Sequence, residues 1–173
     1  MNKSPLDPSE PATAVLLEGK FSGPVAFSDL VRRALAAAAT QGWPEIILSD
    51  PDFRDWPLGE RAVSQSLNLW ARSGRKFTML ATNYDAMHRQ HPRFVIWRQT
   101  WSHLVDCRVA GNRLAREVPS AIWSPMWVFS RFDLARMSGF AGSDAARRVA
   151  LRERLAELLL DSHPGFPATT LGL

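Results

Sequence analysis

The sequence predicts a single α/β domain whose mixed, mostly parallel sheet is covered by helices on both faces. Short strand-like runs alternate with helical patterns along most of the chain, an order that favours parallel strands joined by right-handed crossovers. The run Glu45–Ser49 (EIILS) is apolar almost without interruption, which is typical of a strand buried on both faces. A length of 173 residues suits one domain with a sizeable core.

The first half of the chain supplies strands and helices in alternation. A first strand is expected at residues 14–19 (AVLLEG), and the helix after it has Ser28 as its N-cap and Gly42 as the glycine just past its end. After the strand at Glu45–Ser49, Pro57 suits the first turn of a second helix. Lys76–Ala81 (KFTMLA) is expected to be the next strand.

The second half is less regular. Pro125 interrupts the apolar segment at residues 121–132 (AIWSPMWVFSRF), so this segment is expected to be a hairpin or one broken strand, at an edge or with a bulge. The other elements expected here are helices at residues 83–90, from Pro92 onward and at 144–160, and a strand at 104–109.

The domain is expected to span residues 13–162, after a disordered leader at 1–12 and before a flexible tail at 163–173. The leader lacks the apolar core of a secretory signal, and no apolar run approaches the roughly 18 residues of a membrane-spanning helix. Cys107 is the only cysteine, which excludes an internal disulfide and a cysteine-rich zinc site. These features predict a cytoplasmic protein with no membrane partner.

The net charge of +4 is unevenly distributed. Residues 61–136 carry twelve basic and four acidic side chains, and almost all of the basic ones are arginine. Such an excess attracts anions, nucleic acid included, or docks against the acidic part of the same chain. Its main contributors are Arg89, Arg93, Arg98, Arg108, Arg113 and Arg116.

An acidic loop follows the strand Glu45–Ser49 and contains Asp50, Asp52 and Asp55. Ligands of open parallel sheets bind beyond the carboxyl ends of the strands, where this loop is expected to lie. Carboxylates at that edge can hold Mg²⁺. The alternative interpretation is turn formation by the aspartates, with Asp55 capping the next helix.

The segment 88–103 concentrates histidine, arginine and tryptophan. Helical spacing allows Arg93 to stack on Trp97, and a basic, aromatic helix can hold phosphates and stack bases. The alternative is that the aromatic rings are core and the arginines pair with the acidic loop. His88 and His91 have a chelating spacing, but Pro92 is expected to break the helix between them, so no metal is expected. The candidate binding residues are Asp50, Asp52, Asp55, His91, Arg93, Trp97, Arg98, His103 and Arg108.

No catalytic motif is recognised. The sequence contains no G-x-S-x-G, no glycine-rich phosphate loop and no H-E-x-x-H. Cys107 lies between Asp106 and Arg108 on an expected strand, where alternation sends neighbouring side chains to opposite faces, so a buried structural thiol is expected. No catalytic residue and no cofactor are expected.

The order of elements over residues 14–162 resembles one half of the phospholipase-D-like fold. The patterns D-P-D-F-x-D-W-P-L and H-P-R-F-x-x-W-R-x-x-W-x-H also resemble a family of uncharacterised bacterial proteins. Phospholipase-D-like enzymes carry H-x-K-x-x-x-x-D, and no histidine of this chain is followed two residues later by lysine. The resemblance therefore implies a non-catalytic relative.

These observations predict a domain that binds an anionic, phosphate-containing ligand or partner. Two alternatives stay open. One is a divergent phosphodiester hydrolase, in which His91 or His103 works with Asp50 or Asp52. The other is a homodimer or protein-interaction domain that uses Trp123 and Trp127 on an edge strand.

Overall fold

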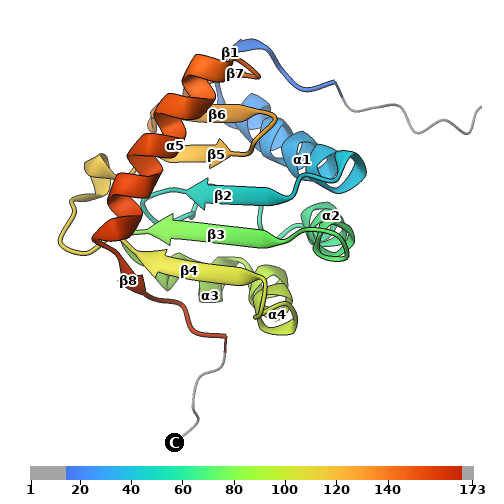
Figure 1. Cartoon of the computed structure of the whole chain (residues 1–173), viewed down its shortest axis with the longest axis vertical. Coiled ribbons are helices and arrows are strands. Elements are labelled where there is room, and N and C mark those ends of the chain that lie inside the picture. The colour runs from blue at the N-terminus through green and yellow to red at the C-terminus, as the bar shows by residue number, and fades with distance from the viewer. Residues whose placement is uncertain (1–14, 169–173) are drawn as a thin grey trace, which may run out of the picture.

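The computed structural model describes residues 15–168, so the leader expected at residues 1–12 lies outside the described residues. Within them, eight strands form one sheet in the order β1-β7-β6-β5-β2-β3-β4-β8 (Figure 1). The strands are β1 (Gly19–Phe21), β2 (Glu45–Ser49), β3 (Lys76–Ala81), β4 (Val105–Val109), β5 (Ser120–Trp123), β6 (Val128–Asp133), β7 (Ser138–Gly142) and β8 (His163–Pro164). The helices are α1 (Pro24–Gln41), α2 (Arg61–Ala71), α3 (Asp85–Gln90), α4 (Pro92–Thr100) and α5 (Ala145–Leu160), with a 3₁₀ turn, η1, at Ala115–Glu117.

The sheet is mixed, as expected, but the prediction that it is mostly parallel is wrong. Only the pairs β2–β3 and β3–β4 are parallel among the described strands, and the other five pairs are antiparallel. The reason is that β5 returns antiparallel beside β2 and continues into a meander of β6 and β7. β7 (SGFAG) was not expected, and Gly139 is required there because a Cβ would overlap the backbone of Ser130.

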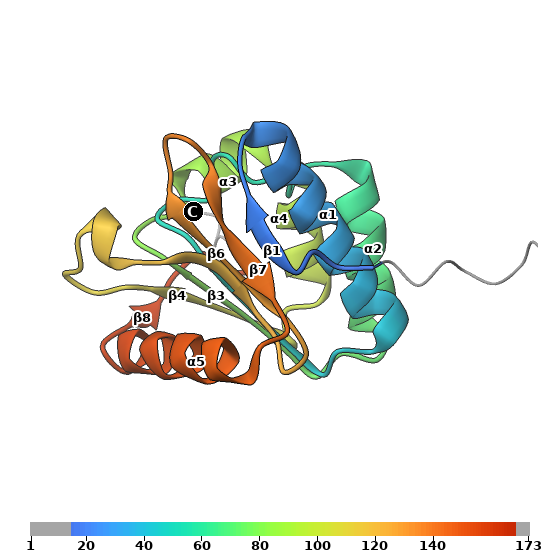
Figure 2. The same cartoon turned by 90° about the horizontal axis from the view of Figure 1, so that it is seen from above.

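Helices cover both faces of the sheet, which confirms that part of the prediction. Figure 2 shows α1, α2, α3 and α4 on one face and α5 alone on the other. The larger core lies under the four helices and is aromatic. Six of the seven tryptophans are buried: Trp43, Trp56, Trp70, Trp97 and Trp127 in this core, and Trp123 in the smaller core under α5. The abundance of tryptophan therefore reflects packing in the core and not an exposed binding surface.

The hairpin predicted at residues 121–132 is present, but it lies inside the sheet. β5 is flanked by β2 and β6, and β6 by β5 and β7. The indole nitrogen of Trp123 donates to the carbonyl of Arg148, and that of Trp127 donates to the carbonyl of Leu17. Both side chains are buried, so the expectation of an edge strand that exposes them as a dimer seam is wrong.

Several element ends also differ from the expected ones. The first helix begins at Pro24 with Gly23 as its N-cap, five residues before the expected cap Ser28, whereas Gly42 ends it in the left-handed conformation, as predicted. The second helix begins at Arg61 and not near Pro57, because turns occupy the preceding loop.

The chain after α5 is packed where a loose tail was expected. β8 pairs with β4, and the buried ring of Phe166 stacks on Tyr84 with ring centres 5.2 Å apart. Residues 169–173 lie outside the described range. Within the described range, no helix has the length and apolar character needed to cross a bilayer.

Candidate functional site

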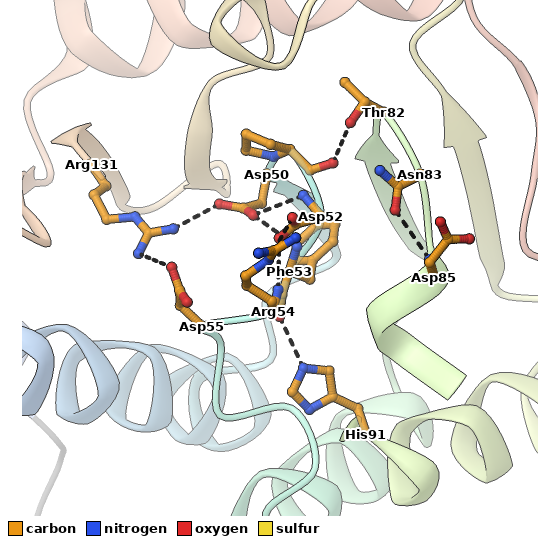
Figure 3. Close-up of polar contacts among 11 residues, drawn as sticks. Asp50, Asp52, Phe53, Arg54, Asp55, Thr82, Asn83, Asp85, His91 and Arg131 are labelled. Atoms are coloured by element: carbon orange, nitrogen blue, oxygen red, sulfur yellow. Dashed lines mark hydrogen bonds and ion pairs between the residues drawn. The ribbon is translucent and has the colours of Figure 1, made fainter. Parts of the chain in front are cut away.

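The carboxyl ends of the parallel strands β2 and β3 meet at one edge of the sheet, where the acidic loop begins. Asp50 Oδ2 accepts hydrogen bonds from the backbone N–H groups of Asp52 (3.1 Å) and Phe53 (2.8 Å). Phe53 has a φ of 58°, in the left-handed region, and its ring is fully buried. Thr82, just after β3, donates to the carbonyl of Pro51 at 2.7 Å (Figure 3). Asp50 thus shapes a strained turn that packing holds in place.

A buried ion pair neutralises the acidic loop from within. Arg131 Nη2 donates to Asp50 Oδ1 at 3.0 Å, and Nη1 lies 3.4 Å from Asp55 Oδ2 (Figure 3). The Arg131 Nε donates to Ser120 Oγ at 3.0 Å, and the guanidinium lies 4.3 Å from the ring centre of Phe27. The side chains of Arg131 and Asp50 are 1% and 3% exposed. Asp50 and Asp55, two of the three carboxylates that were predicted to bind a ligand, therefore pair with Arg131 inside the fold.

The third carboxylate, Asp52, also has a local partner. It forms an exposed ion pair with Arg54 at 2.8 Å, and its other oxygen accepts the backbone N–H of Arg54. No group of three or more His, Cys, Asp or Glu side chains in residues 15–168 is arranged to hold a metal ion. The acidic loop shows the turn formation by Asp50 and Asp52 that the alternative interpretation predicts. The prediction that Asp55 caps the next helix is wrong, because Glu60 is the N-cap of α2 and Asp55 pairs with Arg131.

His91 and Arg93 fasten the acidic loop to α4. His91 is buried, and its Nε2 lies 2.9 Å from the carbonyl oxygen of Phe53, so this nitrogen carries the proton and donates. The exposed Arg93 donates from Nη1 to the carbonyl of Gly59 at 2.9 Å. His103 is exposed just before β4 begins, at the opposite end of the strands. The structure thus brings His91 and Arg93 to the predicted edge but leaves His103 away from it.

The other three candidates are also occupied or buried. Trp97 packs against Phe77, with ring centres 4.9 Å apart, and does not stack on Arg93. Arg108 donates to the hydroxyl and the carbonyl of Ser162. Arg98 is buried, and its Nε and Nη1 have no hydrogen-bond partner among the described residues.

Cys107 is the buried thiol that its strand position predicted. Burial raises the pKa of Cys107 to about 12, an effect that the positive charge of the nearby Arg98 only partly opposes. A thiol with this pKa is almost entirely protonated at neutral pH, and it is therefore not a nucleophile.

A polar pocket of about 390 Å³ lies beside the acidic loop, at the carboxyl end of β3. It is lined by Arg54, Asn83, Asp85, Ala86, Arg89 and Gln90. The Arg89 side chain is exposed and forms no ion pair within the described residues. Figure 3 shows Asn83 and Asp85 following β3 on one side of the acidic loop. The pocket places guanidinium and amide donors at the edge where a ligand was expected.

Sequence reasoning missed Arg131 and most of the pocket. Arg131 is two residues from Phe129, so alternation along β6 places it on the core face, and a charge at such a position signals a buried partner. The segment at residues 82–85 directly follows β3, as the acidic loop directly follows β2. Polar side chains at the end of a strand were the signal that could have predicted the pocket.

No protein-family model and no curated protein matches the chain. A solved structure does resemble it, and its description reads "Structure of TrmBL2, an archaeal chromatin protein, shows a novel mode of DNA binding". The TM-score is 0.62 at 14% sequence identity, and the match covers 91% of this chain and 56% of that one. The chain therefore spans little more than half the length of that protein. At this identity, the similarity shows a shared fold and nothing more.

Proposed function

We propose that the protein is a non-catalytic binding domain for a phosphate-containing ligand, which it holds in the pocket at the carboxyl end of β3. The observation that carries the proposal is one pocket in which Arg89, which forms no ion pair among the described residues, lies with the amides of Asn83 and Gln90 and with Arg54, whose Nε pairs with Asp52. Guanidinium groups bind phosphate oxygens through charge-assisted hydrogen bonds. The pocket's carboxylate, Asp85, suits a hydroxyl or amine on the same ligand.

Nucleic acid is one source of such a phosphate. The chain shares its fold with a chromatin protein described as binding DNA, and its middle third has a large excess of arginine. The resemblance to the phospholipase-D-like fold stays a prediction, as does the absence of catalysis. Against the hydrolase alternative, His91 donates to a carbonyl, and Asp50 is used by Arg131 and two backbone N–H groups.

The test is a titration of isotope-labelled protein with inorganic phosphate at low salt, followed by the nuclear magnetic resonance signals of the pocket side chains. The signals of Arg54, Asn83, Arg89 and Gln90 are expected to shift and saturate together. Arg89→Ala should raise the Kd about tenfold or more, because a hydrogen bond to a charged group contributes about 1.5–3 kcal/mol.

Arg72→Ala is the matched control, since Arg72 is an exposed arginine at the end of α2 and does not line the pocket. It should leave the Kd unchanged. Shifts that spread over all exposed arginines without saturating would contradict the proposal. Phosphodiester turnover that is lost in His91→Ala would favour the hydrolase.

A further inference from the structure

A second candidate site lies at the other side of the sheet, on the face that carries α5. Lys20 of β1 pairs with Phe140 of β7, and Phe140 pairs with Ser130 of β6. Paired residues point to the same face of a sheet. Phe129, the residue before Ser130, points to the opposite face and belongs to the larger core. The face made by β1, β7 and β6 therefore presents Lys20, Phe140 and Ser130, and we call it the β1–β7–β6 face. Phe132 lies farther along β6, where a β-bulge shifts the register between Arg131 and Asp133, and it lines the same hollow as Lys20 and Phe140.

Two aromatic rings lie on this face. Phe132 is 71% exposed, and no other Phe, Trp or Tyr side chain in residues 15–168 is as exposed. Phe140 is half-buried, and the guanidinium of Arg147 from α5 stacks on its ring at 3.8 Å from the centre. Both rings line one hollow of the surface, so one bound molecule can contact the two of them. The two rings and the guanidinium offer flat surfaces for stacking.

The charge around these rings is positive. A hollow of about 520 Å³ is lined by Lys20, Phe132, Phe140 and Arg147 together with residues Phe21, Ser22, Ser138 and Gly139, and no carboxylate lines it. Two carboxylates near these strands have partners of their own: Glu18 accepts the backbone N–H of Ser143, and Asp133 accepts that of Arg136 and pairs with its side chain. Neither Lys20 nor Arg147 forms an ion pair in the part of the chain that the structure describes.

We propose that the β1–β7–β6 face binds single-stranded nucleic acid, with bases stacked on Phe132 and on the Arg147 guanidinium above Phe140, and with phosphates near Lys20. Exposed aromatic rings on antiparallel strands, flanked by cations, are how sheet surfaces hold unpaired bases. A duplex keeps its bases stacked on each other and offers only its backbone, so it leaves the exposed ring of Phe132 unused. The site is separate from the pocket beside the acidic loop and does not depend on it.

The experiment measures fluorescence anisotropy of labelled DNA and RNA strands of about 12 nucleotides, a length within the usual range of site sizes. The wild-type protein should bind a single strand more tightly than the matching duplex, and binding should weaken steeply with salt. Phe132→Ala should weaken binding about five- to a hundred-fold, and Phe132→Trp should preserve it. Lys20→Ala and Arg147→Ala should weaken binding and reduce its salt dependence. Whichever single strand binds more tightly, DNA or RNA, identifies the class of nucleic acid that this face recognises.

Two matched controls lie on other surfaces. Ile96→Ala removes an exposed apolar side chain from α4, and Lys76→Ala removes an exposed lysine from the start of β3. Both should bind like the wild type. Equal or tighter binding of duplex would overturn the proposal, as would single-strand affinity that Phe132→Ala leaves unchanged. A concentration-dependent dimer that only Phe132→Ala splits would assign the face to a second copy of the chain instead.

Discussion

Replacing Arg131 by methionine is expected to lower the free energy of unfolding by about 3–5 kcal/mol, the usual effect of removing one member of a buried ion pair. Methionine fills much of the same volume, so the effect comes mainly from the charge. Without Arg131, Asp50 retains the N–H groups of Asp52 and Phe53 but loses its cation at a position that is 3% exposed. Ser120 Oγ also loses its donor. Denaturant unfolding measures the difference.

Arg136→Met is the matched control for this variant. Arg136 is an exposed arginine in the turn between β6 and β7, and its Nε lies 3.8 Å from Asp133. Its replacement should change the free energy of unfolding by less than about 1 kcal/mol. The double variant Arg131→Met/Asp50→Asn should lose less than the sum of the two single variants, because it removes the buried unpaired carboxylate and leaves only Asp55, which is one-third exposed, without its cation. An Arg131→Met protein as stable as the control would show that the pair contributes little.

Elements with strong local signals could be predicted from the sequence. The apolar runs of β2 and β3 have the bounds that were expected, and Asp144 caps α5 through its side chain. β7 has no such signal, because two of its five residues are glycine. The direction of β5 is set by its pairing with β2, more than 70 residues earlier in the chain, and no local pattern encodes that pairing.

The same distinction between local and distant interactions applies to the site. The sequence placed the acidic loop at the carboxyl end of β2, since strand and loop are contiguous. It did not reveal that Arg131, 81 residues away from Asp50, neutralises the loop. The arginines predicted to hold an anion were chosen by sequence proximity, but Arg93 and Arg108 bind backbone carbonyls of the fold. The exposed Arg89 lay in the same basic stretch and is free of such contacts among the described residues.

The second large effect is a loss of stability at alkaline pH. Burial raises the pKa of Cys107 from 9.0 to about 12, and burial raises the pKa of Tyr84 well above 10.0, with Cys107 as a further cause. Each folded-state pKa lies above its unfolded value, so the unfolded chain releases the proton first. The stabilisation from Cys107 is complete below about pH 9 and is lost progressively as the pH rises to about 12, and that from Tyr84 is complete below about pH 10 and is lost as the pH rises further. Each group contributes a slope of about 1.4 kcal/mol per pH unit within its own window.

Both groups can be followed individually, because the chain has one cysteine and one tyrosine. Cys107→Ala should flatten the stability curve mainly between about pH 9 and 10, because the thiol is the first of the two groups to lose its proton in the unfolded chain, and Tyr84→Phe should flatten it above about pH 10. Ultraviolet absorbance should show tyrosinate appearing together with unfolding and not before it. The opposite result is a curve for Cys107→Ala that runs parallel to the wild type from neutral pH upward. It would mean that the Cys107 thiol reaches solvent in the folded state. That exposure requires β4 to separate from Arg98 and from the segment after α5.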